Sequence, residues 1–180
     1  MKRLYRATRR EPNAERCELC AAPLDDHHHH LYEPRARRIR CACRGCALII
    51  PTAERSPYRR VPKRFERLSI DAAMWLDRLG IPVGIAALIR RDAGAVIAYP
   101  GPVGLVEATA DLEVVAELVA KLEPEVEAII WSNVGVPGAW IAGIDVVFRM
   151  ISEVRKAWVG LAGGPDAPAA VARVLAELAG

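Results

Sequence analysis

The residues with the clearest chemistry are the cysteines and histidines, which are confined to one short segment. All five cysteines and all four histidines lie between Cys17 and Cys46. Their order is Cys-x2-Cys, then four consecutive histidines, then Cys-x-Cys-x2-Cys. Thiolates and imidazoles are the groups that bind a zinc ion, and thiolates also hold iron–sulfur clusters. Two Cys-x2-Cys pairs in one short segment therefore predict a metal site.

These nine side chains exceed the usual four ligands of a tetrahedral site. The simplest set consists of the two Cys-x2-Cys pairs, which are Cys17, Cys20, Cys43 and Cys46. Sets that include Cys41 or a histidine remain open. On a β-strand, His28 and His30 would point to the same face, where they could join this site, form a second site, or belong to an exposed polar run. We interpret His27 and His29 as exposed polar residues.

The identity of the metal and the role of the fifth thiol are separate questions. A set of four cysteines can hold zinc or an iron–sulfur cluster. We expect zinc, because two short cysteine turns joined by a hairpin are typical of zinc ribbons, and the cluster is the alternative. Cys41 is either a redox-sensitive thiol, whose pKa the neighbouring Arg38, Arg40 and Arg44 would lower, or a small buried residue.

The metal is expected to organise the segment that carries its ligands. Residues 17–50 contain few large apolar side chains, whereas ordering a backbone costs about 1–2 kcal/mol per residue. A structural zinc ion contributes about 10–16 kcal/mol in small peptides. Two short strands, over residues 30–33 and 38–41, would form a hairpin that brings the cysteine pairs together.

Composition divides the chain into four parts. Residues 1–16 are predicted to be a basic arm and residues 17–50 the Cys/His metal-binding module. Residues 51–64 contain three prolines and five basic residues, which favour an extended linker. Residues 65–180 form the larger domain.

Hydrophobic periodicity in residues 65–180 predicts four helices and four strands. The helices are expected over 71–79, 112–122, 144–158 and from residue 166 onward, and the strands over 83–89, 95–99, 103–109 and 126–131. The prediction is an α+β fold, with a small zinc-ribbon-like module followed by a four-stranded, mainly antiparallel sheet packed against helices.

Charge is divided unevenly along the chain. Residues 1–67 have 17 Lys and Arg against 8 Asp and Glu, a net charge of +9, whereas residues 68–180 have 8 against 14, a net charge of −6. The basic front could bind an acidic partner such as nucleic acid, or neutralise the acidic half and the thiolates. No stretch reaches the roughly 18 apolar residues of a membrane span, and the first residues lack a secretory signal. A reducing, cytoplasmic location is therefore expected.

The larger domain has no recognisable catalytic set. No histidine follows His30 and no cysteine follows Cys46, which excludes Ser-His-Asp and Cys-His arrangements there. The glycine pairs at 101–104 and 135–138 lack the spacing of phosphate-binding loops and are interpreted as turns. The acidic residues between 123 and 127 are interpreted as an exposed turn. We therefore expect that the protein is not an enzyme.

The Cys/His segment also resembles a known family. The combination Cys-x2-Cys, His-x-His-Leu and Cys-x-Cys-x2-Cys is similar to the front of an uncharacterised, mainly actinobacterial family encoded beside high-affinity NiFe uptake hydrogenases. The resemblance continues through residues 81–91, 99–108, 122–131 and 158–164. It draws particular attention to His28 and His30.

The resemblance implies a metal-binding accessory protein that supports hydrogenase assembly or maturation. Its partners would be hydrogenase subunits or maturation proteins, reached through protein–protein contacts. Two alternatives remain open from the residues: a nucleic-acid-binding regulator with a basic zinc ribbon, and an iron–sulfur electron carrier. The oligomeric state is not predicted.

Overall fold

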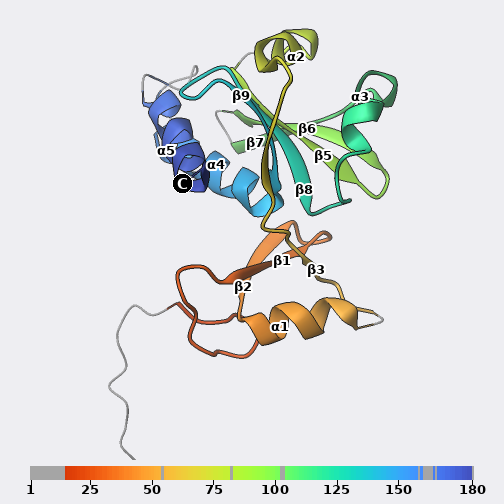
Figure 1. Ribbon diagram of the computed structural model, residues 1–180, viewed down its shortest axis with the longest axis vertical. Helices are drawn as coiled ribbons and strands as arrows, with labels where there is room; N and C mark the ends of the chain where they lie inside the picture. Colours follow the sequence, from red (N-terminus) through yellow and green to blue (C-terminus); the bar gives the residue numbers. More distant parts are fainter. Residues whose placement is uncertain are drawn as a thin grey trace, which may run out of the picture.

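The computed structural model describes residues 15–53, 55–81, 83–101, 104–157, 159, 164 and 166–179. Most of the predicted basic arm, residues 1–16, and most of residues 158–164 fall outside these ranges. The chain forms a small amino-terminal sheet with one helix, followed by a larger sheet with helices on both faces (Figure 1).

The amino-terminal module is built on a three-stranded antiparallel sheet in the order β2-β1-β3. Its elements are β1 (His29–Glu33), β2 (Arg38–Ala42), α1 (Arg44–Ile49), the 3-10 helix η1 (Ile50–Thr52) and β3 (Arg59–Arg60). The predicted hairpin is confirmed, with His30 opposite Cys41. The segment predicted to be a linker, residues 51–64, contains the end of η1, all of β3 and the buried Val61.

The larger sheet is antiparallel throughout its described strands, in the order β4-β9-β8-β5-β6-β7. Its strands are β4 (Phe65–Leu68), β5 (Ile85–Arg91), β6 (Gly94–Gly101), β7 (Gly104–Thr109), β8 (Glu127–Ser132) and β9 (Gly138–Gly143). The α+β class and the antiparallel pairing are confirmed, but the prediction of four strands was wrong, because the sheet has six. The two extra strands are β4, which has only four residues, and β9, which is rich in Gly and Ala.

Helices cover both faces of the larger sheet. They are α2 (Ala72–Arg78), α3 (Leu112–Val119), α4 (Ile144–Lys156) and α5 (Ala167–Ala179). In β5, Ile85, Ala87 and Ile89 face the cluster that includes α4 and α5, whereas the alternate residues Ala86 and Leu88 face α2 and α3. The predicted cap at Asp71 is confirmed, since its side chain accepts a hydrogen bond from the Met74 N–H. No helix among the described residues has the length and apolar character needed to cross a bilayer.

The amino-terminal module packs on the side of the sheet that carries α4. Tyr32 of β1 is fully buried in that core cluster, and its ring centroid lies 6.0 Å from that of Phe148. Val61 donates its backbone N–H to the carbonyl of His30 at 3.0 Å. The two parts of the chain therefore share one apolar core.

A buried ion-pair cluster strengthens this junction. The Arg91 guanidinium donates to the hydroxyl of Tyr32 at 3.0 Å, to Glu125 at 3.0 Å and to Glu107 at 3.1 Å. Glu125 and Glu127 are buried, and Glu127 accepts a hydrogen bond from Arg64. The interpretation of these acidic residues as an exposed turn was therefore wrong, because two of the carboxylates are drawn inward by arginines.

Candidate metal centre

The structure brings together the four cysteines of the two Cys-x2-Cys pairs. The sulfur atoms of Cys17, Cys20, Cys43 and Cys46 all lie within 4.8 Å of one another. The Cys20 and Cys43 sulfurs are 3.6 Å apart. Tetrahedral zinc with Zn–S bonds of about 2.3 Å requires sulfur atoms about 3.8 Å apart. All five cysteines are free thiols, so this donor set fits a single metal ion.

Two tight turns present these thiols. In the first turn, Ala21 donates its N–H to the carbonyl of Cys17 at 2.8 Å and adopts a φ of 59°. In the second, Cys43 caps the N-terminus of α1, because its sulfur accepts the N–H of Cys46 at 3.5 Å. A thiol at position 43 thus serves both the helix and the site.

Glu18 joins the first turn to the hairpin. Its backbone N–H donates to the Cys41 carbonyl at 2.9 Å, and its carboxylate accepts the Cys41 N–H at 2.7 Å. These paired contacts hold the turn of Cys17 and Cys20 against β2. Because β2 leads directly into Cys43, they also bring the two cysteine pairs together.

The thiols differ in their readiness to ionise. Burial raises the pKa of Cys17, but hydrogen bonds from the backbone of Cys43, Leu19 and Cys20 outweigh it and lower this pKa to about 6. Burial, together with the side chains of Cys20, Cys43 and Cys17, raises the pKa of Cys46 to about 12. Sulfurs this close repel one another when charged, so full ionisation requires a cation among them.

Cys41, His28 and His30 form a second group. One ligand atom from each of these side chains lies within 4.8 Å of the other two. His30 is directly opposite Cys41 in the hairpin, and His28 precedes His30 by two residues. The cross-strand pairing of His30 with Cys41, together with the two-residue spacing of His28 and His30, therefore brings the three side chains together.

Each histidine of this group has one ring nitrogen already engaged. The Nδ1 of His28 lies 2.9 Å from the carbonyl oxygen of Asp25. The Nδ1 of His30 lies 2.6 Å from Oδ2 of Asp145, in the first turn of α4. Since these oxygens accept, both Nδ1 atoms donate, and the lone pair of each neutral ring is on Nε2. Sequence reasoning missed Asp145 as a histidine partner, because 115 residues separate it from His30.

The prediction that arginines lower the pKa of Cys41 was wrong. Burial raises this pKa, and the negative charges of Glu15, Glu18 and Cys17 raise it further. The nearby Arg40 is paired with Glu18 at 3.2 Å and approaches Glu33 at 3.8 Å, so these carboxylates offset its charge. These surroundings therefore favour the thiol form of Cys41 over the thiolate.

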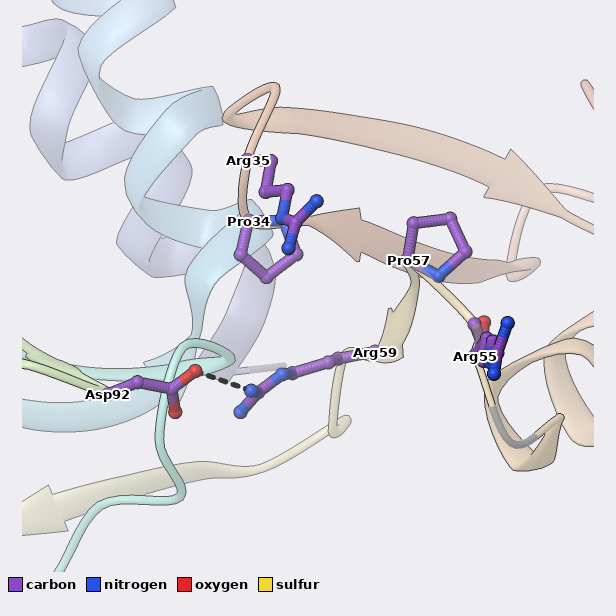
Figure 2. Close-up of a pocket in the computed structure, with 7 residues that line it drawn as sticks. Pro34, Arg35, Arg55, Pro57, Arg59 and Asp92 are labelled. Atoms are coloured by element: carbon purple, nitrogen blue, oxygen red, sulfur yellow. Dashed lines mark hydrogen bonds and ion pairs between the residues drawn. The ribbon is translucent and has the colours of Figure 1, made fainter.

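A separate cavity of about 570 Å³ lies near the β1–β2 turn, at the end of the hairpin away from the cysteines. Figure 2 shows Arg59 reaching across it to Asp92, and the two side chains pair at 2.6 Å. Its described lining contains neither cysteine nor histidine. The metal ligands therefore lie outside this cavity.

Comparison with protein families identified a match over most of the chain. A family described as a family of unknown function, DUF5947, matches residues 16–180. No curated protein and no solved structure matches the chain. The matched range includes every cysteine and histidine discussed above.

Proposed function

We propose that this chain, which belongs to the DUF5947 family, is a zinc-binding accessory protein that supports the assembly or maturation of NiFe hydrogenases. The observation that carries the metal-binding part is the convergence of four cysteine sulfurs within 4.8 Å. The hydrogenase part rests on the sequence resemblance, and the absence of a recognisable catalytic set favours a non-enzymatic role.

A single ion fits this donor set better than a multi-iron cluster. A cluster places several iron and sulfide atoms between its cysteines and so spreads their sulfurs apart. The 3.6 Å separation of the Cys20 and Cys43 sulfurs suits ligands of one tetrahedral ion instead. Zinc would link the turn at Cys17 to the start of α1, and it would add no redox chemistry.

The same ion would orient a surface suited to a protein partner. Helix α1 follows Cys43 and carries Cys46, so metal binding fixes its position. On this helix the apolar residues Leu48 and Ile49 are 48% and 71% exposed. Exposed apolar side chains on a rigid helix are suited to a protein–protein contact.

Metal content tests the first part of the proposal. Protein purified without oxygen should be colourless and contain zinc, and Cys46→Ser should lose the zinc of the four-cysteine site. An iron-containing preparation with a visible spectrum would instead support the electron carrier and refute the zinc assignment.

Co-purification tests the second part. The tagged chain should recover hydrogenase subunits or maturation proteins from cells that make them. Leu48→Asp should retain zinc but lose these partners, whereas Met74→Asp, on the exposed surface of α2, should retain both. Recovery of the wild-type chain alone would contradict the accessory role.

A further inference from the structure

We propose that His28, His30 and Cys41 form a second metal site, which holds one divalent transition-metal ion and leaves one coordination position open. This site is distinct from the four-cysteine site, since its three ligands belong to a separate group of side chains. Three protein ligands with a free fourth position are typical of sites that exchange ligands, whereas four thiolates close a structural site.

The backbone places the three ligands before any ion arrives. His30 and Cys41 are cross-strand partners in the hairpin, and His28 lies two residues before His30, just ahead of β1. One ring nitrogen from each histidine and the Cys41 sulfur already lie within 4.8 Å of one another. Zinc bonds of about 2.0–2.3 Å to nitrogen and sulfur need ligand atoms about 3.3–3.6 Å apart, which small side-chain rotations would achieve.

The surroundings of both histidines match those of metal-bound imidazoles. Such imidazoles donate their second N–H to a carboxylate or a backbone carbonyl, which fixes the ring and its tautomer. Here Asp145 takes this role for His30 at 2.6 Å, and the Asp25 carbonyl takes it for His28 at 2.9 Å. In both rings Nε2 is the nitrogen left to bind the ion.

An unpaired buried atom supplies independent support. The side chain of His28 is only 10% exposed. Its Nε2 is buried and has no hydrogen-bond partner among the described residues. A buried polar atom without a partner is costly, and a metal ion would satisfy this lone pair.

A cavity beside the two histidines would give the ion an access route and room for a fourth ligand. It has a volume of about 290 Å³, and its lining includes His28, His30 and Asp145. A divalent ion bound by two neutral imidazoles and one thiolate would keep a net charge of +1. The Asp145 carboxylate, which contacts Nδ1 of His30, would balance this charge. Mixed nitrogen and sulfur donors suit zinc, cobalt, nickel and copper rather than magnesium or calcium.

Cobalt provides the test, because a thiolate bound to Co²⁺ gives an intense charge-transfer band. The full chain, with zinc retained in the four-cysteine site, is titrated with Co²⁺ under reducing conditions. We expect one equivalent to bind with a thiolate band, and we expect Cys41→Ser to lose that band. The second site would be overturned if the thiolate band were absent, or if the band were unchanged in Cys41→Ser. The zinc content of the same samples tests the four-cysteine site separately.

Two double variants separate this site from adventitious binding by the histidine run. His28→Ala/His30→Ala and His27→Ala/His29→Ala each leave two histidines, but only the second pair preserves the proposed ligands. The first variant should lose the Co²⁺ equivalent and the second should keep it. Equal losses in both variants would overturn the proposal.

Asp145→Asn tests the positioning role and provides a milder change. It should weaken Co²⁺ binding about 10–100-fold while the thiolate band and the circular dichroism spectrum stay unchanged. If the histidine double variant does not fold, Asp145→Asn and Cys41→Ser carry the test. Unchanged Co²⁺ affinity in Asp145→Asn would show that the carboxylate does not support the site.

Discussion

Removal of the Glu125 carboxylate should destabilise the junction between the two sheets. Glu125 is buried, and it accepts hydrogen bonds from the Arg91 guanidinium at 3.0 Å and from the Asp92 N–H at 2.9 Å. Arg91 also holds Tyr32 of the amino-terminal module. A Glu125→Ala substitution therefore removes two charge-assisted hydrogen bonds at one buried position.

The expected magnitude follows from the partners that remain. Hydrogen bonds to charged groups contribute about 1.5–3 kcal/mol each, and breaking a buried ion pair costs about 3–5 kcal/mol. Arg91 keeps Glu107 at 3.1 Å, so its charge is not left unpaired. We expect Glu125→Ala to lower the free energy of unfolding by about 3 kcal/mol, and Glu125→Gln, which keeps the shape and an acceptor, by about 1–2 kcal/mol.

Urea denaturation of the metal-loaded protein, followed by tryptophan fluorescence, measures this loss. Glu123→Ala is the matched control, because Glu123 is exposed and only two residues away. Its change in unfolding free energy should stay within about 0.5 kcal/mol. A Glu125→Ala variant as stable as this control would refute the assignment of a stabilising role to the buried cluster.

Three further predictions concern the metal, the core and a helix cap. Removal of the metal with a chelator should abolish the protection of amide protons in β1, β2 and α1, whereas β5 and β8 should stay protected, as measured by hydrogen exchange. Simultaneous loss of protection in both sheets would contradict a metal-organised module. Ile130→Ala, at a fully buried position, should lower the free energy of unfolding by about 2–5 kcal/mol in urea denaturation, and a loss below about 1 kcal/mol would exclude tight packing there. Asp71→Ala should cost about 1 kcal/mol in the same assay, because Met74 loses its capping acceptor, and Asp71→Asn should recover most of the loss.

The local features of the fold were predictable from the sequence. The hairpin and the helix capped by Asp71 follow from periodicity and capping chemistry, which act over a few residues. Strand β9 was missed because its Gly and Ala residues carry little strand preference. Strand β4 was missed because four residues with two charges give a weak pattern.

In the candidate site, too, some features could be predicted from the sequence and others could not. Cysteine spacing was enough to indicate which four thiols would meet, because short Cys-x2-Cys turns present both sulfurs to one point. The partner of His30 could not be read from the sequence, since Asp145 reaches it through the packing of α4 against the amino-terminal module. The burial of the Glu125 carboxylate likewise depends on Arg91, which lies in β5, 34 residues earlier in the chain.

The sulfur of Cys43 caps the N-terminus of α1 and is also one of the four sulfurs of the candidate metal centre. Alkylation or oxidation of this one atom would therefore withdraw the acceptor of the Cys46 N–H and a thiolate donor together. Electrophiles and peroxides would thus damage helix and coordination in a single event, and an occupying ion would shield both.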